Sequence, residues 1–453
     1  MGLIDLLLFP LYVLFFSLVF AARRKHIEDP VLKKYHLYGF WIKVFSTIAF
    51  IVYSVLFKGD SMSLYYPEGI NISKLIIRDF SNIKLLFIPG KDFDENLLAD
   101  SFNRGYFASE SNYFIARLVA VFSFVTVGSY SCITLIFSMI SFSGVWRLYK
   151  FFYEQYPHLH KKLAIAIIYL PTFVFWSSGI LKDPICTGMM GWLSYGLYNL
   201  FIKKQGLIKN SLTIIISVVI LGTIKLYILV SYLPFLLLFI VLQYVLMAKH
   251  FVTKASIFVG ILISSIVGIY ILTDKLKEEM GGLALDKLTE SVKTTQDNFL
   301  NISDQAESSF SLGVTFDGST GSLVKIAPAA ITATLFRPYL WESKKISTLL
   351  SSIESLVLML FTIYVFFKAG PFRFAGGIIK DPMILYCFCF SILFALFVGA
   401  TTLNFGTLVR YKIPCMPFYI IALILIAERI KHKKIKQEID VINIPEPSNL
   451  IAD

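Results

Sequence analysis

Charged residues are scarce in this 453-residue chain: they make up 16% of it, whereas a soluble domain averages about 25%. Hydrophobic residues make up 56%. This balance excludes a soluble enzyme with a single anchor and indicates an integral membrane protein with many spans. The formal net charge of +12 does not indicate a nucleic-acid partner, because lysine and arginine collect in the cytoplasmic loops of multi-span proteins.

Histidine and cysteine are also few, with six and five residues. All six histidines lie in segments that we expect on the cytoplasmic side, so the outer face has no histidine for a zinc site or a Ser-His triad. The cysteines lie in or beside apolar runs without the context of zinc ligands, and we interpret them as small apolar residues. No glycine-rich nucleotide fingerprint is present, so nucleotide-driven transport and nucleotide-sugar chemistry find no support.

Apolar runs define the expected architecture, because a helix that crosses a membrane needs about 20 apolar residues. We expect an all-α protein with eleven spans, near residues 3–21, 38–57, 131–149, 163–180, 184–201, 211–224, 227–247, 255–272, 346–367, 382–400 and 412–427. The segment 112–128 is ambiguous. We expect it to be re-entrant or interfacial, because only then do the short loops that hold just over half of the 42 lysine and arginine residues share one side.

This topology divides the chain into three parts. Residues 1–37 form an additional N-terminal span, retained because it lacks a signal-peptide cleavage site, and a cytoplasmic loop. Residues 38–430 form the main membrane domain, with two long extracytoplasmic loops at 58–111 and 273–345; loops of that length are usually functional or structured. Residues 431–453 form a basic cytoplasmic tail, which we expect to be partly disordered.

Cations occur at the outer ends of several spans, where the positive-inside rule disfavours them. They are Lys182, Lys225, Arg337, Arg410 and Lys412. A cation in that position suggests a partner, either an acidic side chain or an anionic ligand. Arginine offers the bidentate fork that phosphate prefers. Together these residues predict a binding site for an anionic headgroup.

Each of these positions also has a simpler explanation. Asp183, beside Lys182, is expected to cap the helix that begins with Pro184. Arg337 and Glu342 are close enough in sequence for a local ion pair. Arg410 is explained equally by an internal salt bridge or by contact with a lipid headgroup.

Acidic residues mark the first outer loop. Asp60 lies three residues beyond a span, and the sequence DFDE supplies Asp92, Asp94 and Glu95. A carboxylate at the membrane surface can act as a general base toward an acceptor hydroxyl. Acids at alternate positions can also hold a divalent cation, which would place a metal at Asp92 and Asp94. An ordinary solvated loop explains the DFDE sequence as well.

The sequence RYKIPCMPFYIIALILIA, which begins at Arg410, resembles the C-terminal signature of bacterial membrane glycosyltransferases of the GT-C superfamily. In that signature an Arg-Tyr-x-x-Pro-x-x-Pro pattern precedes the last span. The stretch LPTFVFWSSGILKDP is similar to a turn of the same family, and in SVVILGTIKLYILV the residue Lys225 stands where an arginine is common. The chain departs from the family by an additional N-terminal span.

The resemblance implies transfer of a sugar from a polyprenyl-phosphate-linked donor on the outer face of the bacterial cytoplasmic membrane. The acceptor would be an envelope glycan, lipid or protein. Asp60 would be the catalytic acid-base, the outer cations would bind the lipid phosphate, and Tyr411 would be a further site residue because it belongs to the motif. No cofactor is implied with certainty.

Two other functions remain open. A polymerase or ligase of lipid-linked polysaccharide also has many spans, a large outer loop and essential arginines; a product assay separates single sugar addition from chain lengthening. A non-catalytic subunit of envelope assembly, or a transporter, is the other alternative. Transporters tend to have ionisable residues near mid-span and inverted repeats, and we find neither in the sequence.

Overall fold

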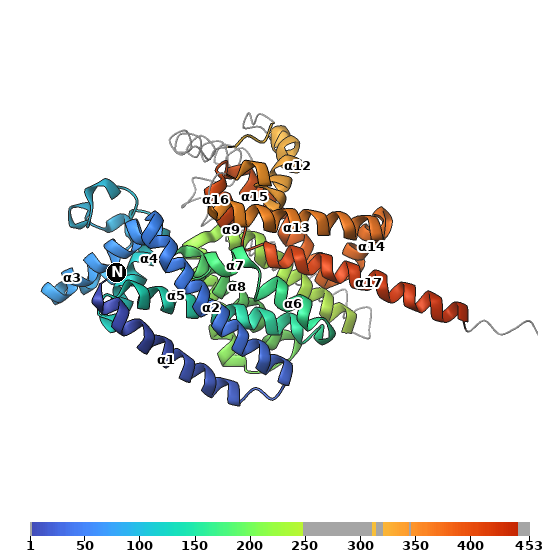
Figure 1. Ribbon diagram of the computed structural model, residues 1–453, viewed down its shortest axis with the longest axis horizontal. Helices are drawn as coiled ribbons and strands as arrows, with labels where there is room; N and C mark the ends of the chain where they lie inside the picture. The colour runs from blue at the N-terminus through green and yellow to red at the C-terminus, as the bar shows by residue number, and fades with distance from the viewer. Residues whose placement is uncertain (1, 248–309, 314–319, 344–345, 443–453) are drawn as a thin grey trace, which may run out of the picture.

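The computed structural model describes residues 2–247, 310–313, 320–343 and 346–442 (Figure 1). All elements of regular secondary structure in these residues are helical, which agrees with the expected all-α fold. The expected span at 255–272 and much of the expected outer loop 273–345 lie outside the described residues.

The described part of the chain contains α-helices and short π and 3-10 segments. The α-helices are α1 (Leu3–Lys25), α2 (Pro30–Phe57), α3 (Tyr66–Arg78), α4 (Glu110–Thr126), α5 (Tyr130–Tyr153), α6 (His160–Ile167), α7 (Pro171–Trp176), α8 (Lys182–Leu197), α9 (Leu207–Met247), α12 (Thr320–Phe336), α13 (Ile346–Ala369), α14 (Pro371–Lys380), α15 (Pro382–Thr401), α16 (Phe405–Tyr411) and α17 (Met416–Ile442). Short π and 3-10 segments are η1 (Ser61–Tyr65), η2 (Phe80–Leu86), η3 (Gly90–Asp92), η4 (Glu95–Leu97), η5 (Ser101–Asn103), η6 (Pro157–Leu159), η7 (Tyr198–Ile202) and η8 (Leu340–Glu342).

Six of the described helices are long and apolar enough to cross a membrane: α1, α2, α5, α9, α13 and α15. A seventh span results if α16 and α17, which meet at an angle of 61°, count as one broken helix. The chain is therefore a multi-pass membrane protein, with six to seven candidate spans in its described part. Eleven spans are not shown.

Part of the difference arises between residues 160 and 180, where we expected a continuous span at 163–180 and the chain breaks into α6 and α7. The expected span at 184–201 corresponds to α8, which is shorter than a full span by itself but continues directly into the π-helical η7. Pro171 begins α7 and leaves Leu170 extended, at φ −65° and ψ 114°. The break follows from proline chemistry, because proline cannot donate the hydrogen bond that would continue a helix and restricts the residue before it.

Helix α9 covers two of the expected apolar runs, and its backbone is non-helical only at Lys225, with φ −147° and ψ 76°. A straight helix of its 41 residues would be about 60 Å long. Both of its ends nevertheless return to the end of α8: Gly196 packs on Ile214, and the Tyr244 hydroxyl donates to the Phe201 carbonyl. The chain therefore reverses at Lys225.

The segment 58–111, which we expected as the first outer loop, is folded. It begins after Lys58, whose left-handed backbone ends α2, and it continues through η1, α3 and four 3-10 segments to α4. The buried Glu68 organises it by accepting hydrogen bonds from the Ala99 amide at 3.0 Å and from Asn71 at 3.1 Å. Helix α4, which contains most of the ambiguous segment 112–128, has 17 residues and is not among the six candidate spans.

Helices α5 and α8 approach each other through glycine. A methyl group on Gly144 of α5 would overlap the backbone carbonyl of Gly188 on α8, and one on Gly191 would overlap the carbonyl of Gly144. Helices that pack through small residues bring their backbones into direct contact, which is a common way to hold spans together without a hydrophobic driving force.

We expect Gly144→Ala to lower the melting temperature of the purified protein by several degrees. The new methyl group meets backbone that cannot rotate away, and overpacking of this kind costs about 1–3 kcal/mol. The matched control is Gly376→Ala on α14, where nothing lies within 4 Å of the new methyl group. The control should melt at the wild-type temperature or slightly above it. Equal melting of both variants would contradict direct α5–α8 contact.

Candidate functional site

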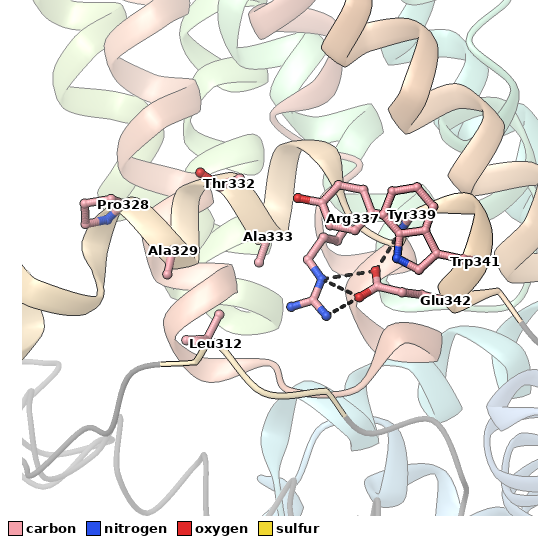
Figure 2. Close-up of a pocket in the computed structure, with 9 residues that line it drawn as sticks. All are labelled: Leu312, Pro328, Ala329, Thr332, Ala333, Arg337, Tyr339, Trp341 and Glu342. Atoms are coloured by element: carbon pink, nitrogen blue, oxygen red, sulfur yellow. Dashed lines mark hydrogen bonds and ion pairs between the residues drawn. The ribbon is translucent and has the colours of Figure 1, made fainter.

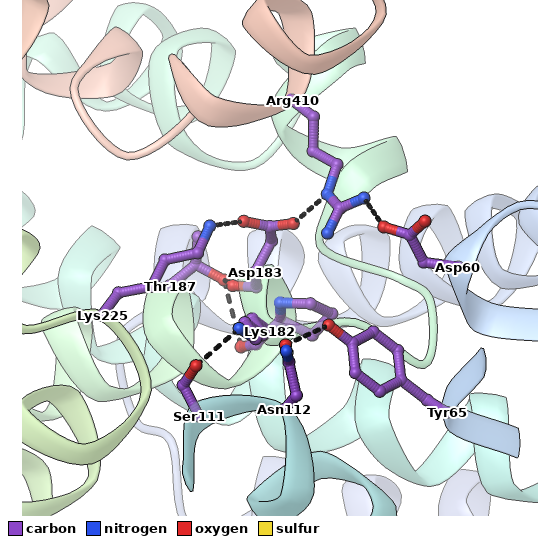
Figure 3. Close-up of polar contacts among 10 residues, drawn as sticks. Asp60, Tyr65, Ser111, Asn112, Lys182, Asp183, Thr187, Lys225 and Arg410 are labelled. Atoms are coloured by element: carbon purple, nitrogen blue, oxygen red, sulfur yellow. Dashed lines mark hydrogen bonds and ion pairs between the residues drawn. The ribbon is translucent and has the colours of Figure 1, made fainter. Parts of the chain in front are cut away.

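Four charged side chains from distant parts of the chain meet in one cluster, which we call the charge cluster: Asp60, Asp183, Lys225 and Arg410 (Figure 3). Arg410 Nε donates to Asp183 Oδ2 at 2.7 Å, and Arg410 Nη1 donates to Asp60 Oδ2 at 2.6 Å. Lys225 donates to the other carboxylate oxygen of Asp183. The structure thus brings together four of the residues that the sequence singled out.

Burial of the charge cluster decreases from its centre to its edge. The Asp183 side chain has no exposed surface, Lys225 is 5% exposed, Arg410 is 14% exposed and Asp60 is 42% exposed. Burial alone would raise the pKa of Asp183, but the charges of Lys225 and Arg410 outweigh it and lower that pKa. Asp183 is therefore the fixed anion of the cluster, and Asp60 is the member that a ligand can reach.

Local backbone structure explains how Lys225 and Asp183 meet. Lys225 occupies the break in α9, and its ammonium group also lies 4.5 Å from the centre of the Tyr411 ring. Asp183 lies in the first turn of α8, which starts at Lys182. The expectation that Asp183 caps this helix was wrong: the cap position belongs to Leu181, and the Asp183 carboxylate turns to the two cations instead.

Polar side chains of the segment 58–111 and of α4 border the charge cluster (Figure 3). Tyr65 is buried, donates to Asn112 Oδ1 at 3.3 Å and accepts from the Tyr106 hydroxyl at 3.0 Å. Lys182 donates to Ser111 Oγ at 2.7 Å. Burial, and then the nearby charge of Lys225, lower the pKa of Lys182 to about 8.

Of these bordering residues, sequence reasoning identified Lys182 but missed Asn112, Ser111 and Tyr106. The only feature of the sequence that could have pointed to these three residues was their position in or next to the expected outer loop 58–111. The sequence pointed more clearly to Tyr65, because it follows Asp60 by five residues.

Arg337 and Glu342 lie beside a separate cleft of about 450 Å³ (Figure 2). Arg337 Nε lies 3.0 and 3.1 Å from the two carboxylate oxygens of Glu342, so the local ion pair expected for these residues is present. The Arg337 guanidinium also lies 4.5 Å from the ring centre of Phe310. Tyr339 and Trp341 stack at 5.0 Å on the rim, and Trp341 is 81% exposed.

Lys412 follows Arg410 closely in sequence but lies in different surroundings. It is fully buried, and its ammonium group donates to the Arg337 carbonyl at 3.0 Å and to Ser355 Oγ at 2.7 Å. The side chain thus joins the end of α12 to α13. Lys412 therefore does not join the charge cluster and does not line the cleft of Arg337.

The acids of the DFDE sequence are exposed and lie in 3-10 turns. Asp94 caps η4 by accepting from the Asn96 amide at 2.9 Å, and Glu95 accepts from the Gly105 amide at 2.6 Å. Asp92 lies at the end of η3. In the described part of the chain, no three His, Cys, Asp or Glu side chains are grouped closely enough to hold a metal ion.

The chain matches no known family, no curated protein and no solved structure. Its chemistry must therefore be derived from the site.

Two atoms of the charge cluster are open to a ligand. Among the described residues, Arg410 Nη2 has no hydrogen-bond partner, and Figure 3 shows it directed away from both carboxylates. Asp60 Oδ1 likewise has no partner among the described residues. The free guanidinium nitrogen can donate to an anion, and the free carboxylate oxygen can accept a proton.

We expect Asp183→Asn to destabilise the protein strongly. The substitution leaves Lys225 and Arg410 facing each other without a buried anion, and breaking a buried pair in this way costs about 3–5 kcal/mol. Thermal unfolding of the purified variant, or its failure to accumulate in folded form, measures this. Asp94→Asn, in an exposed turn, is the control and should behave as wild type. An Asp183→Asn variant with wild-type stability would show that the charge cluster does not hold the helices together.

Proposed function

We propose that this protein is a membrane glycosyltransferase that moves a sugar from a polyprenyl-phosphate-linked donor to an envelope acceptor. The reaction takes place at the outer face of a bacterial cytoplasmic membrane. One observation carries the proposal: an accessible carboxylate, Asp60, shares a guanidinium with a buried anion, and both Asp60 and Arg410 keep one free atom. The resemblance of the closing sequence motif to the GT-C superfamily supports the same reaction.

The chemistry requires a proton acceptor and a group that stabilises a leaving phosphate. The acceptor hydroxyl oxygen forms a bond to the anomeric carbon of the sugar, and its proton passes to Asp60. The bond between the anomeric carbon and the phosphate oxygen breaks, and the electron pair remains on the phosphate. Arg410 Nη2 donates to that oxygen as its charge grows.

The other members of the charge cluster hold these two groups in position. Asp183 and Lys225 hold Arg410 from the buried side, so the guanidinium does not need to reorganise when charge develops. Lys182 supplies a further cation beside them, held by Ser111.

The cleft beside Arg337 suits a sugar. An aromatic pair at its rim offers a flat apolar face, and Arg337, Glu342 and Thr332 supply polar groups within it. A site with an apolar wall and a few fixed polar groups is the usual form of a small-ligand pocket. The cleft is linked to the motif of Arg410, because Lys412 donates to the carbonyl of Arg337.

Asp60→Asn tests the base. We expect the variant to fold and insert normally, because an amide oxygen still accepts from Arg410, and to lose about 10²–10⁴-fold in transfer rate because an amide cannot take a proton. The assay uses membranes with a radiolabelled polyprenyl-phosphate sugar and measures its transfer to the cell-envelope fraction.

Asp92→Asn is the matched control, since its carboxylate lies in an exposed turn. It should retain wild-type activity. Full activity of Asp60→Asn together with loss in Asp92→Asn or Asp94→Asn would place the base in the DFDE sequence. Long chains in place of single additions would identify a polymerase.

Arg410→Lys tests the phosphate site. Lysine keeps the charge but has no fork, so it cannot hold Asp60 and Asp183 and also donate to a ligand. We expect affinity for a polyprenyl-phosphate analogue to fall about tenfold, the effect of losing one charged hydrogen bond. Arg429→Lys is the matched control, because this arginine on α17 forms an ion pair with Asp381 at 3.6 Å and has no ion pair with the charge cluster. Unchanged affinity with a lower melting temperature would make Arg410 a purely structural residue.

A further inference from the structure

A second cavity lies between α1 and α2, near the start of α2, whereas Asp60 follows the end of that helix. The cavity has a volume of about 300 Å³ and is formed by one face of α1 and one face of α2 near their connecting turn. The hairpin is closed by Arg24 Nε, which donates to the Lys33 carbonyl at 3.1 Å. We call this cavity the hairpin groove.

Charge is concentrated at one end of the hairpin groove. Arg24, Lys25 and Lys33 line it beside the connecting turn, and no acidic residue lines it. Within the described part of the chain, none of these three cations forms an ion pair. The nearby Asp29 is already used, because its carboxylate accepts from the amides at the start of α2 and from the Tyr153 hydroxyl at 2.6 Å.

The other end of the hairpin groove is apolar. Phe20, Phe40 and Trp41 line it, and the rings of Phe20 and Phe40 lie 4.8 Å apart. Seven residues separate Ser17 from Arg24 on α1, a distance of about 10 Å along the helix axis. The hairpin groove therefore changes from cationic to apolar along the direction in which α1 crosses the membrane.

Only 6% of the apolar stretch of α1 is buried by the described protein, so as a membrane span it is open to lipid along most of its length. Figure 1 shows it at one margin of the molecule beside α2 and α5, and its Leu14 and Leu18 side chains are exposed. A ligand of the hairpin groove can thus enter sideways from the bilayer. An amphiphile with an anionic head and acyl chains matches both ends of the cavity, whereas a soluble anion would leave the apolar end unfilled.

We infer that the hairpin groove binds an anionic phospholipid, with the headgroup phosphate at Arg24, Lys25 and Lys33 and one acyl chain along Phe20, Phe40 and Trp41. Basic pockets between spans on the cytoplasmic side recognise such headgroups. By the positive-inside rule this end of the hairpin is cytoplasmic, so the lipid belongs to the inner leaflet. The inference is independent of the proposed transfer reaction.

Competition binding on the purified full-length protein in detergent tests this inference. A fluorescent phosphatidylglycerol is displaced by unlabelled phosphatidylglycerol, by phosphatidylcholine with the same acyl chains, or by glycerol phosphate, which has the head but no chains. We expect only phosphatidylglycerol to compete well. Equal competition by phosphatidylcholine would overturn the inference that the site selects an anionic headgroup. Equal competition by glycerol phosphate would overturn the inference that the ligand is a lipid.

Two double variants with the same change of charge locate the site. Lys25→Gln with Lys33→Gln removes two cations from the hairpin groove, and we expect roughly 30-fold weaker binding, given the usual effect of each basic residue near an anionic headgroup. Arg23→Gln with Lys34→Gln removes two exposed cations from the same turn that do not line the cavity, and it should change affinity less than about threefold. Equal losses in both would show general attraction to a basic surface and overturn the site.

Ala21→Phe provides a variant that keeps every charge. Ala21 lines the hairpin groove, and a ring in its place fills the apolar end. We expect this variant to lose phosphatidylglycerol binding while its melting temperature in lipid-free detergent stays the same. Wild-type affinity in Ala21→Phe would overturn the placement of the acyl chain, and this variant decides the matter if the Lys25→Gln/Lys33→Gln protein does not fold. Arg410→Lys, altered at the proposed outer site, should bind the lipid as wild type does.

Discussion

The buried carboxylate of Asp183 is the constraint on which the described structure depends. It lies between Lys225 and Arg410 with no exposed surface, so each of the three ions needs the other two. Lys225 reaches it only because α9 breaks and reverses at that residue. Arg410 reaches it only because α16 and α17 meet at 61° instead of forming a straight span. The break in α9 and the angle between α16 and α17 thus bring two cations to the same carboxylate.

The proposed function depends on the decrease in burial from the centre of the charge cluster to its edge. The centre of the charge cluster is dry and fixed, which costs desolvation but leaves the Arg410 guanidinium oriented before any ligand arrives. Its edge, at Asp60, is open to solvent. The folded segment 58–111 contributes to this edge, because a hydrogen bond from Tyr65 to Asn112 connects η1 to α4 beside the cluster. We therefore expect substitutions at the centre to affect stability and, under the proposed function, a substitution at the edge to affect transfer.

Cations serve three different purposes in this protein, although they look alike in the sequence. Lys412 is buried and joins α12 to α13 through a carbonyl and a hydroxyl. Lys225 pairs with a carboxylate at a helix break. Arg24, Lys25 and Lys33 have no acidic partner in the described residues and lie at the mouth of an apolar cavity. What distinguishes these cations is the group that each one contacts. For Lys412 and Lys225 that group is distant in the sequence.

The sequence by itself determined that this is an all-helical multi-pass membrane protein, and it pointed to Asp60, Asp183, Lys225 and Arg410 as unusual. Apolar length and the position of a charge at the end of an apolar run are local properties, so they can be read along the chain. The tertiary structure decided which charges pair, that Asp183 faces two cations instead of capping its helix, and that the run at 163–180 breaks into two short helices. These features depend on which helix ends meet in space, and a buried charge takes the partner that packing brings within reach, whatever its distance along the sequence.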